Sequence, residues 1–240
     1  MAGPVASALL LALALAAFAH FARGGSVGFP PRGWPVGRPR YFTRAAARIA
    51  LLFGASSLLL LGVAGRWSAL VTMPREFIPV RDTIGAFSLS ARGTLMLGGA
   101  IVAGALIGAG AARLTKRRMQ IGRLGAVLPR ARAELGWGLL LSLIAGVCEE
   151  LFFRLLVPLL VTMVIGIPAI GFATATLLFG AAHRYQGWAG IVATTLVGAL
   201  LAYAYVATAS LVVAITLHVF IDVNALVLRP LLTGRISLRR

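Results

Sequence analysis

The stretch LGWGLLLSLIAGVCEELFFRLLVPLLVT, residues 135–162, is almost continuously apolar, yet it carries Glu149, Glu150 and Arg154 near its middle. A spanning helix needs about 20 mostly apolar residues, so this stretch is long enough to cross a bilayer as a tilted helix. Ionisable groups are costly inside hydrocarbon and mark functional positions there. The stretch therefore predicts a membrane helix whose polar side chains face the protein interior.

The composition of the whole chain agrees with a lipid environment. Of the 240 residues, 60% are hydrophobic and 12% are charged, and the mean hydropathy is +0.94. A soluble domain carries roughly 25% charged residues to cover its surface. These values exclude a disordered chain, a coiled coil and a secreted enzyme. Cys148 is the only cysteine, which excludes a disulfide scaffold.

Further apolar runs on both sides of residues 135–162 predict an all-α, polytopic membrane helix bundle of about seven transmembrane helices. The expected spans are 5–22, 45–65, 93–112, 135–162, 166–184, 188–207 and 209–229. An eighth, shorter or re-entrant segment is left open within 66–92 or 135–165. We divide this single membrane domain into N-terminal helices and basic loops, 1–134, and a C-terminal helix core, 135–240, which carries most of the acids and histidines within the spans.

The charge of the chain is strongly positive, with 23 Lys and Arg against 6 Asp and Glu. Cytoplasmic loops of membrane proteins collect such residues, which explains the excess without a nucleic-acid partner. With seven spans, the Arg-rich loops at 23–44 and 113–134 and the C-terminal tail fall on one side. This pattern predicts an N-terminus outside and a cytoplasmic C-terminus. The preference for Arg over Lys indicates a GC-rich bacterial genome, and hence a bacterial inner membrane.

Polar residues in the spans recur at a spacing of four, which places two side chains on one face of a helix. The pairs are Glu150 with Arg154, Phe179 with His183, and His218 with Asp222. Glu149 is rotated by about 100° from Glu150 and needs a partner on another helix or a water molecule. Lipid-facing placement of these groups is prohibitive, so we expect an active site inside the bundle.

Several functions fit buried acids and histidines. The zinc-protease pattern HExxH, the serine motif of rhomboid proteases and the GxGD motif of aspartyl proteases are all absent. Glu–Arg and His–Asp pairs can also join helices without any catalysis. A proton- or ion-coupled transporter that uses the cluster as a relay, and a non-catalytic membrane immunity or scaffold protein, therefore remain alternatives.

Three motifs in successive hydrophobic spans resemble those of a known family. They are EELFFR at 149–154, FGAAH at 179–183 and HVFID at 218–222. Their types, EExxxR, FxxxH and HxxxN/D, and their order resemble the CPBP family, the CAAX-protease and bacteriocin-processing intramembrane endopeptidases. The resemblance covers 135–229. It implies an endopeptidase, of glutamic type, that acts on a membrane-associated peptide or protein at the lipid bilayer.

The resemblance also implies a role for each motif residue. Glu149 would activate the hydrolytic water with assistance from His183, while His218 and Asp222 would stabilise the oxyanion. Many members carry Asn at the last position, and Asp222 can donate a hydrogen bond only when it is protonated.

The supporting residues implied by the resemblance are Glu150 and Arg154, which would hold the helix geometry, and Phe179. No cofactor is favoured, because the chain has neither HExxH nor thiolate ligands. Zinc is the alternative, and its ligands would be Glu149, His183 and His218.

Overall fold

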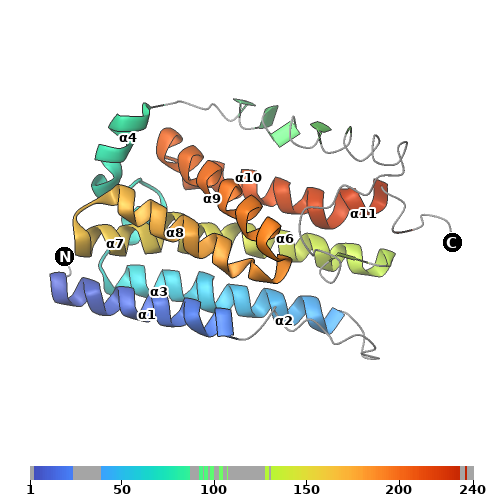
Figure 1. Cartoon of the computed structure of the whole chain (residues 1–240), viewed down its shortest axis with the longest axis horizontal. Helices are drawn as coiled ribbons and strands as arrows, with labels where there is room; N and C mark the ends of the chain where they lie inside the picture. The colour runs from blue at the N-terminus through green and yellow to red at the C-terminus, as the bar shows by residue number, and fades with distance from the viewer. Residues whose placement is uncertain are drawn as a thin grey trace.

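The computed structural model describes residues 3–23, 39–86, 128–129, 131–232 and 236, together with scattered residues between 92 and 107. Within these ranges every regular element is helical. The long helices lie side by side along the long axis of one bundle, and the start of α1 and the end of α11 lie at opposite ends of it (Figure 1). The predicted all-α membrane bundle is confirmed.

The N-terminal part forms two long helical rods and a group of short helices. The first rod is α1, and the second joins α2 to α3 through a π-helix, η1. Their bounds are α1 Pro4–Arg23, α2 Pro39–Ile49, η1 Ala50–Ala55 and α3 Ser56–Val63. The short helices that follow are η2 Trp67–Leu70, η3 Arg75–Phe77 and α4 Ile78–Ile84.

The C-terminal part contains four further rods, two of them interrupted by π-helices. The first rod comprises η5 Arg132–Glu134, α6 Leu135–Glu150, η6 Leu151–Leu156 and α7 Val157–Ile165. The next two are α8 Pro168–Ala182 and, after η7 Arg184–Gln186, α9 Trp188–Thr208. The last comprises α10 Leu211–Val223, η8 Asn224–Leu228 and α11 Arg229–Leu232.

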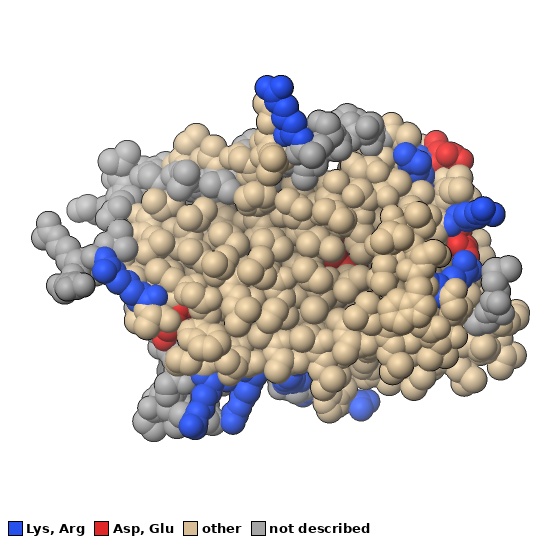
Figure 2. All heavy atoms as spheres, turned by 180° about the vertical axis from the view of Figure 1, so that it is seen from behind, with Lys and Arg blue, Asp and Glu red and all other residues tan. Residues whose placement is uncertain are grey.

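Several of these rods have the length and apolarity of membrane spans. Within the part of the chain that the structure describes, four helices qualify, namely α1, Pro39–Val63, α9 and Leu211–Leu232, and α8 is a shorter apolar helix. Large apolar side chains such as Leu9, Leu59 and Leu196 are exposed, which suits contact with lipid. Figure 2 shows a face whose broad middle is uncharged apart from one small acidic patch, with Lys, Arg, Asp and Glu along its margins.

Six of the seven predicted spans correspond to described rods. The predicted span 93–112 and the basic loop 113–134 lie mostly outside the described residues, so the count of seven stays a prediction. The second rod begins at Pro39, earlier than the predicted residue 45. The reason is that α2 begins amphipathically, with Tyr41 and Phe42 buried while Arg44 is exposed, which a hydropathy criterion alone does not detect.

The places left open for an eighth segment contain no further span in the described chain. Residues 67–84 form only short helices, of which α4 lies against α8 and α9. Residues 135–165 belong to one continuous rod, which begins with η5 and ends at Ile165. Its middle turn is η6, a π-helix, and such single turns inside α-helices are frequent at functional sites.

The aromatic core fastens the N-terminal rods to the α6–α7 rod. Phe53 of η1 is fully buried, and its ring centroid lies 4.7 Å from that of Phe152 and 5.1 Å from that of Phe153. Phe21 of α1 packs on Phe53 from the other side, at 4.6 Å. Aromatic pairs at such spacings stabilise a fold by more than the apolar area that they bury would alone. The aromatic contact holds α1 and η1 against the helix that carries the EELFFR motif.

Helices α6 and α10 lie close together at a glycine. A Cβ atom at Gly146 would lie 2.5 Å from Cγ2 of Val219 and 3.2 Å from its backbone nitrogen. Only a residue without a side chain therefore fits here. Gly146 lies one turn before the two glutamates, and Val219 directly follows His218. The contact between Gly146 and Val219 thus keeps the EELFFR motif of α6 close to the HVFID motif of α10.

We expect Gly146→Ala to destabilise the fold, because the added methyl group pushes α10 away from α6. Overpacking of this kind costs about 1–3 kcal/mol. The measurement is the thermal unfolding temperature of the purified protein in detergent. Gly136→Ala is the matched control on the same helix, since nothing lies within 4 Å of a Cβ there. Equal unfolding temperatures of the two variants would contradict the proposed close contact.

Candidate active site

Glu150 is the central acceptor of the buried polar cluster. It is the last residue of α6, and its side chain is 0% exposed. Its Oε1 lies 2.7 Å from Nδ1 of His218 on α10, and its Oε2 lies 3.1 Å from Nε of Arg154 in η6. An ionised carboxylate only accepts, so Nδ1–H of His218 is the donor. Glu150 therefore joins the Arg154 pair, expected from their spacing, to a histidine on another helix.

The other ring nitrogen of His218 faces two further acids. Its Nε2 lies 4.0 Å from Oε2 of Glu149 and 3.8 Å from Oδ2 of Asp222. Glu149 is buried, whereas the Asp222 side chain is 28% exposed. His218 is thus the group on another helix that faces Glu149, at a distance beyond that of a hydrogen bond. The hydrogen bond at Nδ1 fixes the ring so that Nε2 points at both carboxylates.

His183 is oriented by the backbone of its own helix. Its Nδ1 lies 2.8 Å from the carbonyl oxygen of Phe179. A carbonyl oxygen only accepts, so Nδ1 carries the proton and Nε2 of the neutral ring holds the lone pair. The residue is the C-cap of α8, where the chain leaves helical geometry. His183 therefore presents a hydrogen-bond acceptor from the end of the helix.

The ring of Phe179 lies among three polar side chains, those of His183, His218 and Arg154. The ring centroid lies 4.8 Å from that of His183 and 5.7 Å from that of His218. The guanidinium carbon of Arg154 lies 4.4 Å from the same centroid, a cation–π contact. Phe179 thereby covers the buried cation on one side and supports both imidazoles on the other. This is a packing reason for the aromatic residue four positions before His183.

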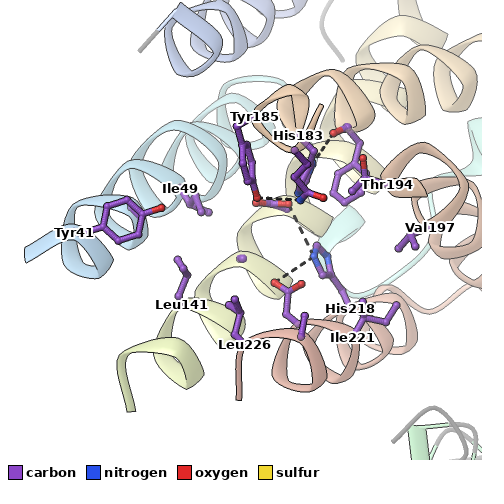
Figure 3. Close-up of a pocket in the computed structure, with 17 residues that line it drawn as sticks. Tyr41, Ile49, Leu141, His183, Tyr185, Thr194, Val197, His218, Ile221 and Leu226 are labelled. Atoms are coloured by element: carbon purple, nitrogen blue, oxygen red, sulfur yellow. Dashed lines mark hydrogen bonds and ion pairs between the residues drawn. The ribbon is translucent and has the colours of Figure 1, made fainter. Parts of the chain in front are cut away.

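The four residues predicted as catalytic share one cavity of about 200 Å³. Glu149, His183, His218 and Asp222 all line it, together with Phe179. Figure 3 shows His183 and His218 directed toward the same space from α8 and α10. Glu150 and Arg154 do not line the cavity and lie behind its wall. The structure therefore divides the motif residues into a lining set and a supporting set.

Sequence reasoning missed other residues of the cavity wall. Tyr185 of η7 lines the cavity, with its ring centroid 5.8 Å from that of His183, and its hydroxyl accepts a hydrogen bond from Nε2 of Gln186 at 3.2 Å. Tyr41 lines the cavity from α2. For Tyr185 the signal was its place two residues after the FGAAH motif. For Tyr41 the sequence held no signal, because only packing brings α2 to this site.

The described residues do not form a ready metal centre. They contain no group of three or more His, Cys, Asp or Glu side chains arranged as metal ligands. His218 already uses Nδ1 for Glu150, and His183 uses Nδ1 for a backbone carbonyl. Both hydrogen bonds leave Nε2 of the ring available, and metal-bound histidines are commonly held in this way, so zinc at Glu149, His183 and His218 stays the alternative, and we derive no step through a metal.

The arrangement has the components of acid–base hydrolysis. A carboxylate and a neutral imidazole on different helices line one small cavity, where both can contact a single water molecule. A second imidazole is oriented by a buried carboxylate, as is common for histidines that must present a defined nitrogen. An acid lies one helical turn beyond it.

Comparison with known proteins agrees with this geometry. Residues 131–224 match the family model of the type II CAAX prenyl endopeptidase Rce1-like proteins. This helical core is an Rce1-like domain. Over these residues the match confirms the CPBP and CAAX family of intramembrane proteases that the motifs predicted. No curated protein and no solved structure matches the chain.

The Rce1-like domain contains all three motifs. It begins directly before η5 and ends at the first residue of η8. The chain is thus a multi-pass membrane protein with a CAAX-type endopeptidase domain. The helices α1 to α4 lie outside the matched residues, although α2 contributes Tyr41, Ala45 and Ile49 to the cavity of this domain.

We expect Glu150→Gln to lower both the amount of folded protein and its activity. The change leaves the buried Arg154 without its charge partner, and breaking a buried pair costs about 3–5 kcal/mol. It also removes the carboxylate that orients His218, so cleavage per folded molecule should fall by on the order of 10-fold or more. The measurements are the amount of folded protein that can be purified from membranes and the rate of peptide cleavage per folded molecule.

Asp82→Asn is the control, because Asp82 is exposed on α4 and far along the chain from the motifs. It should match the unaltered protein in both measurements. Full activity per folded molecule in Glu150→Gln would show that Glu150 does not orient His218.

Proposed function

We propose that the chain is an intramembrane endopeptidase of glutamic type that hydrolyses peptide bonds of membrane-associated peptides or proteins. The observation that supports this most is that Glu149, His183, His218 and Asp222 line one cavity inside an Rce1-like domain. The acids and histidines come from three helices, so a relay of protons along one helix has less support than a shared reaction centre.

In the proposed mechanism Glu149 is the general base. Its carboxylate takes a proton from a water molecule, and the water oxygen attacks the carbonyl carbon of the scissile bond. Nε2 of His183 accepts the second hydrogen bond of this water and so orients it. Base catalysis by a positioned side chain contributes typically 10²–10⁴-fold, roughly. Glu149 then gives the proton to the amide nitrogen, the C–N bond breaks, and a carboxylate and an amine leave.

The negative oxygen of the tetrahedral intermediate needs hydrogen-bond donors. We assign this role to His218, whose Nε2–H in the doubly protonated ring is the donor, and to Asp222 in its protonated form. Donors fixed before the reaction are effective because they need no reorganisation during it. Glu150 and Arg154 are positioning residues: Glu150 holds the His218 ring through Nδ1, and Arg154 holds Glu150.

The proposed orientation places the N-terminus outside and the C-terminus in the cytoplasm of a bacterial inner membrane, with the cavity opening toward the cytoplasm. The Arg-rich loops support this proposal. Figure 1 is compatible with it, since the start of α1 and the end of the last described helix, α11, lie at opposite ends of the bundle. Reporter fusions at residue 240 and within residues 116–130 should both report a cytoplasmic position, and an external signal from either would reverse the orientation.

Glu149→Gln should abolish cleavage while the fold is retained. Glutamine keeps the shape of the side chain and removes the base, so the rate should fall by at least about 100-fold. The measurement is mass spectrometry of cleaved membrane peptides from cells with the unaltered chain and from cells with the variant. Glu134→Gln, which changes an acid outside the cavity lining, is the control. Unchanged cleavage products in Glu149→Gln would contradict the catalytic assignment.

Asp222→Asn should retain most activity if Asp222 acts as a protonated donor, because the amide N–H takes nearly the same place. If instead the ionised acid orients His218, the rate should fall by on the order of 10–100-fold. We expect the first result, together with activity that survives prolonged chelation. Loss of activity on chelation, restored by stoichiometric zinc, would replace the glutamic mechanism with a metal-dependent one.

A further inference from the structure

A phenol hydroxyl lines the cavity beside His183. Tyr185 belongs to η7, the short helix that follows the FGAAH motif, and it is one of the residues that line the cavity. Its ring centroid lies 5.8 Å from that of His183. In Figure 3 the side chain enters the space from the side opposite to His218. The reaction centre therefore has a second polar wall, across from the donors on α10.

Gln186 fixes the position of this hydroxyl. Its Nε2 lies 3.2 Å from Oη of Tyr185, and because an amide nitrogen only donates, the phenol oxygen is the acceptor in this bond. Gln186 is buried and packs so closely on Gly190 that a side chain there would collide with its Cβ atom. The hydroxyl is thus held through its oxygen, and it can give its own proton to a further acceptor.

The surroundings of Tyr185 keep its hydroxyl protonated. Burial raises the pKa of Tyr185 above its usual value, and the nearby carboxylates of Glu149 and Asp222 raise this pKa further. A phenol that keeps its proton is a neutral hydrogen-bond donor. Tyr185 differs in this respect from Asp222, which donates only in its protonated form.

A peptide in the cavity has more than one carbonyl that needs a donor. In an extended chain the backbone carbonyls of successive residues point to opposite sides. When the scissile carbonyl faces His218 and Asp222, an adjacent carbonyl therefore faces the wall that Tyr185 occupies. A carbonyl that leaves water without gaining a hydrogen bond is destabilised. Substrate binding is consequently favoured by a donor on this second wall.

The other polar groups of this wall are turned elsewhere. The hydroxyl of Thr194 donates to the backbone carbonyls of Gly190 and Ile191 on its own helix. The amide of Gln186 is directed at Tyr185, and Figure 3 places Tyr41 on the far side of the cavity from His218. Among the described residues of the lining, Tyr185 is the donor that suits the adjacent carbonyl best.

We propose that the Tyr185 hydroxyl is a substrate-binding group that donates a hydrogen bond to a main-chain carbonyl adjacent to the scissile one, and that Gln186 is its positioning residue. The inference rests on the proposed endopeptidase function and adds a contact to the peptide backbone. This contact holds the scissile carbonyl toward α10. It is available to every substrate sequence, because the backbone is common to all of them.

The test removes each partner of this hydrogen bond in turn. The full-length protein in lipid nanodiscs is first given a mixture of synthetic peptides with varied residues around one bond, and mass spectrometry identifies the most rapidly cleaved peptide. In two analogues of this peptide an alkene replaces the amide unit directly before or directly after the scissile one, which removes that carbonyl and keeps the extended shape.

The protein variants are Tyr185→Phe, which removes the donor, and Gln186→Met, which removes the group that holds it. Tyr203→Phe is the matched control, because Tyr203 is exposed on α9 and lies outside the cavity lining. The double variant Tyr185→Phe with Gln186→Met tests whether the two residues act as a unit. The measurements are KM and kcat for each protein with each peptide.

We expect Tyr185→Phe to raise KM by roughly 2–12-fold, the factor that one typical net hydrogen bond contributes. The value of kcat should change little, because the contact is made equally in the ground state and the transition state. Gln186→Met should raise KM by a smaller factor, and it should add nothing in the Tyr185→Phe background. Tyr203→Phe should leave both constants unchanged.

The alkene peptides identify the carbonyl. With one of the two, the KM of the unaltered protein should rise, and Tyr185→Phe should raise KM no further. With the other, Tyr185→Phe should still have its full effect. If Tyr185→Phe does not fold, the same comparison with Gln186→Met decides the result.

The adverse outcomes are distinguishable. If the unaltered protein cleaves the peptides and Tyr185→Phe leaves KM unchanged, or raises it equally for all three peptides, the inference is wrong while the endopeptidase function stands. A fall in kcat at constant KM would also overturn it, because Tyr185 would then act in the chemical step. If the unaltered protein cleaves no peptide of the mixture and no peptide in cells, the proposed function fails and this inference fails with it.

Discussion

Glu150 is buried inside the bundle, where its carboxylate contacts the imidazole of His218 and the guanidinium of Arg154. The geometry of the site depends on these two contacts. Its Oε1 accepts from His218 on α10 and its Oε2 lies beside Arg154 in η6. An unpaired buried charge is far more costly than a paired one, so the three side chains constrain one another. The constraint turns Nε2 of His218 toward Glu149 and Asp222. Replacing Glu150 would remove the hydrogen bond that joins α6 to α10 and would leave the His218 ring without its fixed orientation.

The N-terminal helices complete this arrangement without carrying any of its acids or histidines. Phe53 packs on Phe152 of the π-helix that follows Glu150, and Phe21 packs on Phe53. Arg184, the residue directly after His183, donates a hydrogen bond to the backbone carbonyl of Ala22 at the end of α1. Low local polarity strengthens the hydrogen bonds of the site. The N-terminal part therefore anchors both the motif helix and the loop of His183.

The sequence predicted those features of the structure that depend on local spacing. Apolar runs located the described rods, and the interval of four predicted that Arg154 lies beside Glu150 and Asp222 beside His218. Contacts between helices far apart in the chain could not be predicted in this way. The bond from Glu150 to His218 requires the close approach at Gly146, and the place of Tyr41 in the cavity requires α2 to pack on α6. The π-helices depend on backbone hydrogen bonds, which periodicity does not reveal.

The most direct measurement of the central interaction is solid-state NMR of the protein in lipid bilayers. With only three histidines in the chain, ¹⁵N labelling of the imidazoles gives a tractable spectrum, and ¹³C labelling of the glutamate carboxyl groups identifies their neighbours. We predict a strong dipolar coupling between Nδ1 of His218 and the carboxyl carbon of Glu150, with the proton on Nδ1. A His218 ring whose Nδ1 has no carboxyl neighbour would contradict the account.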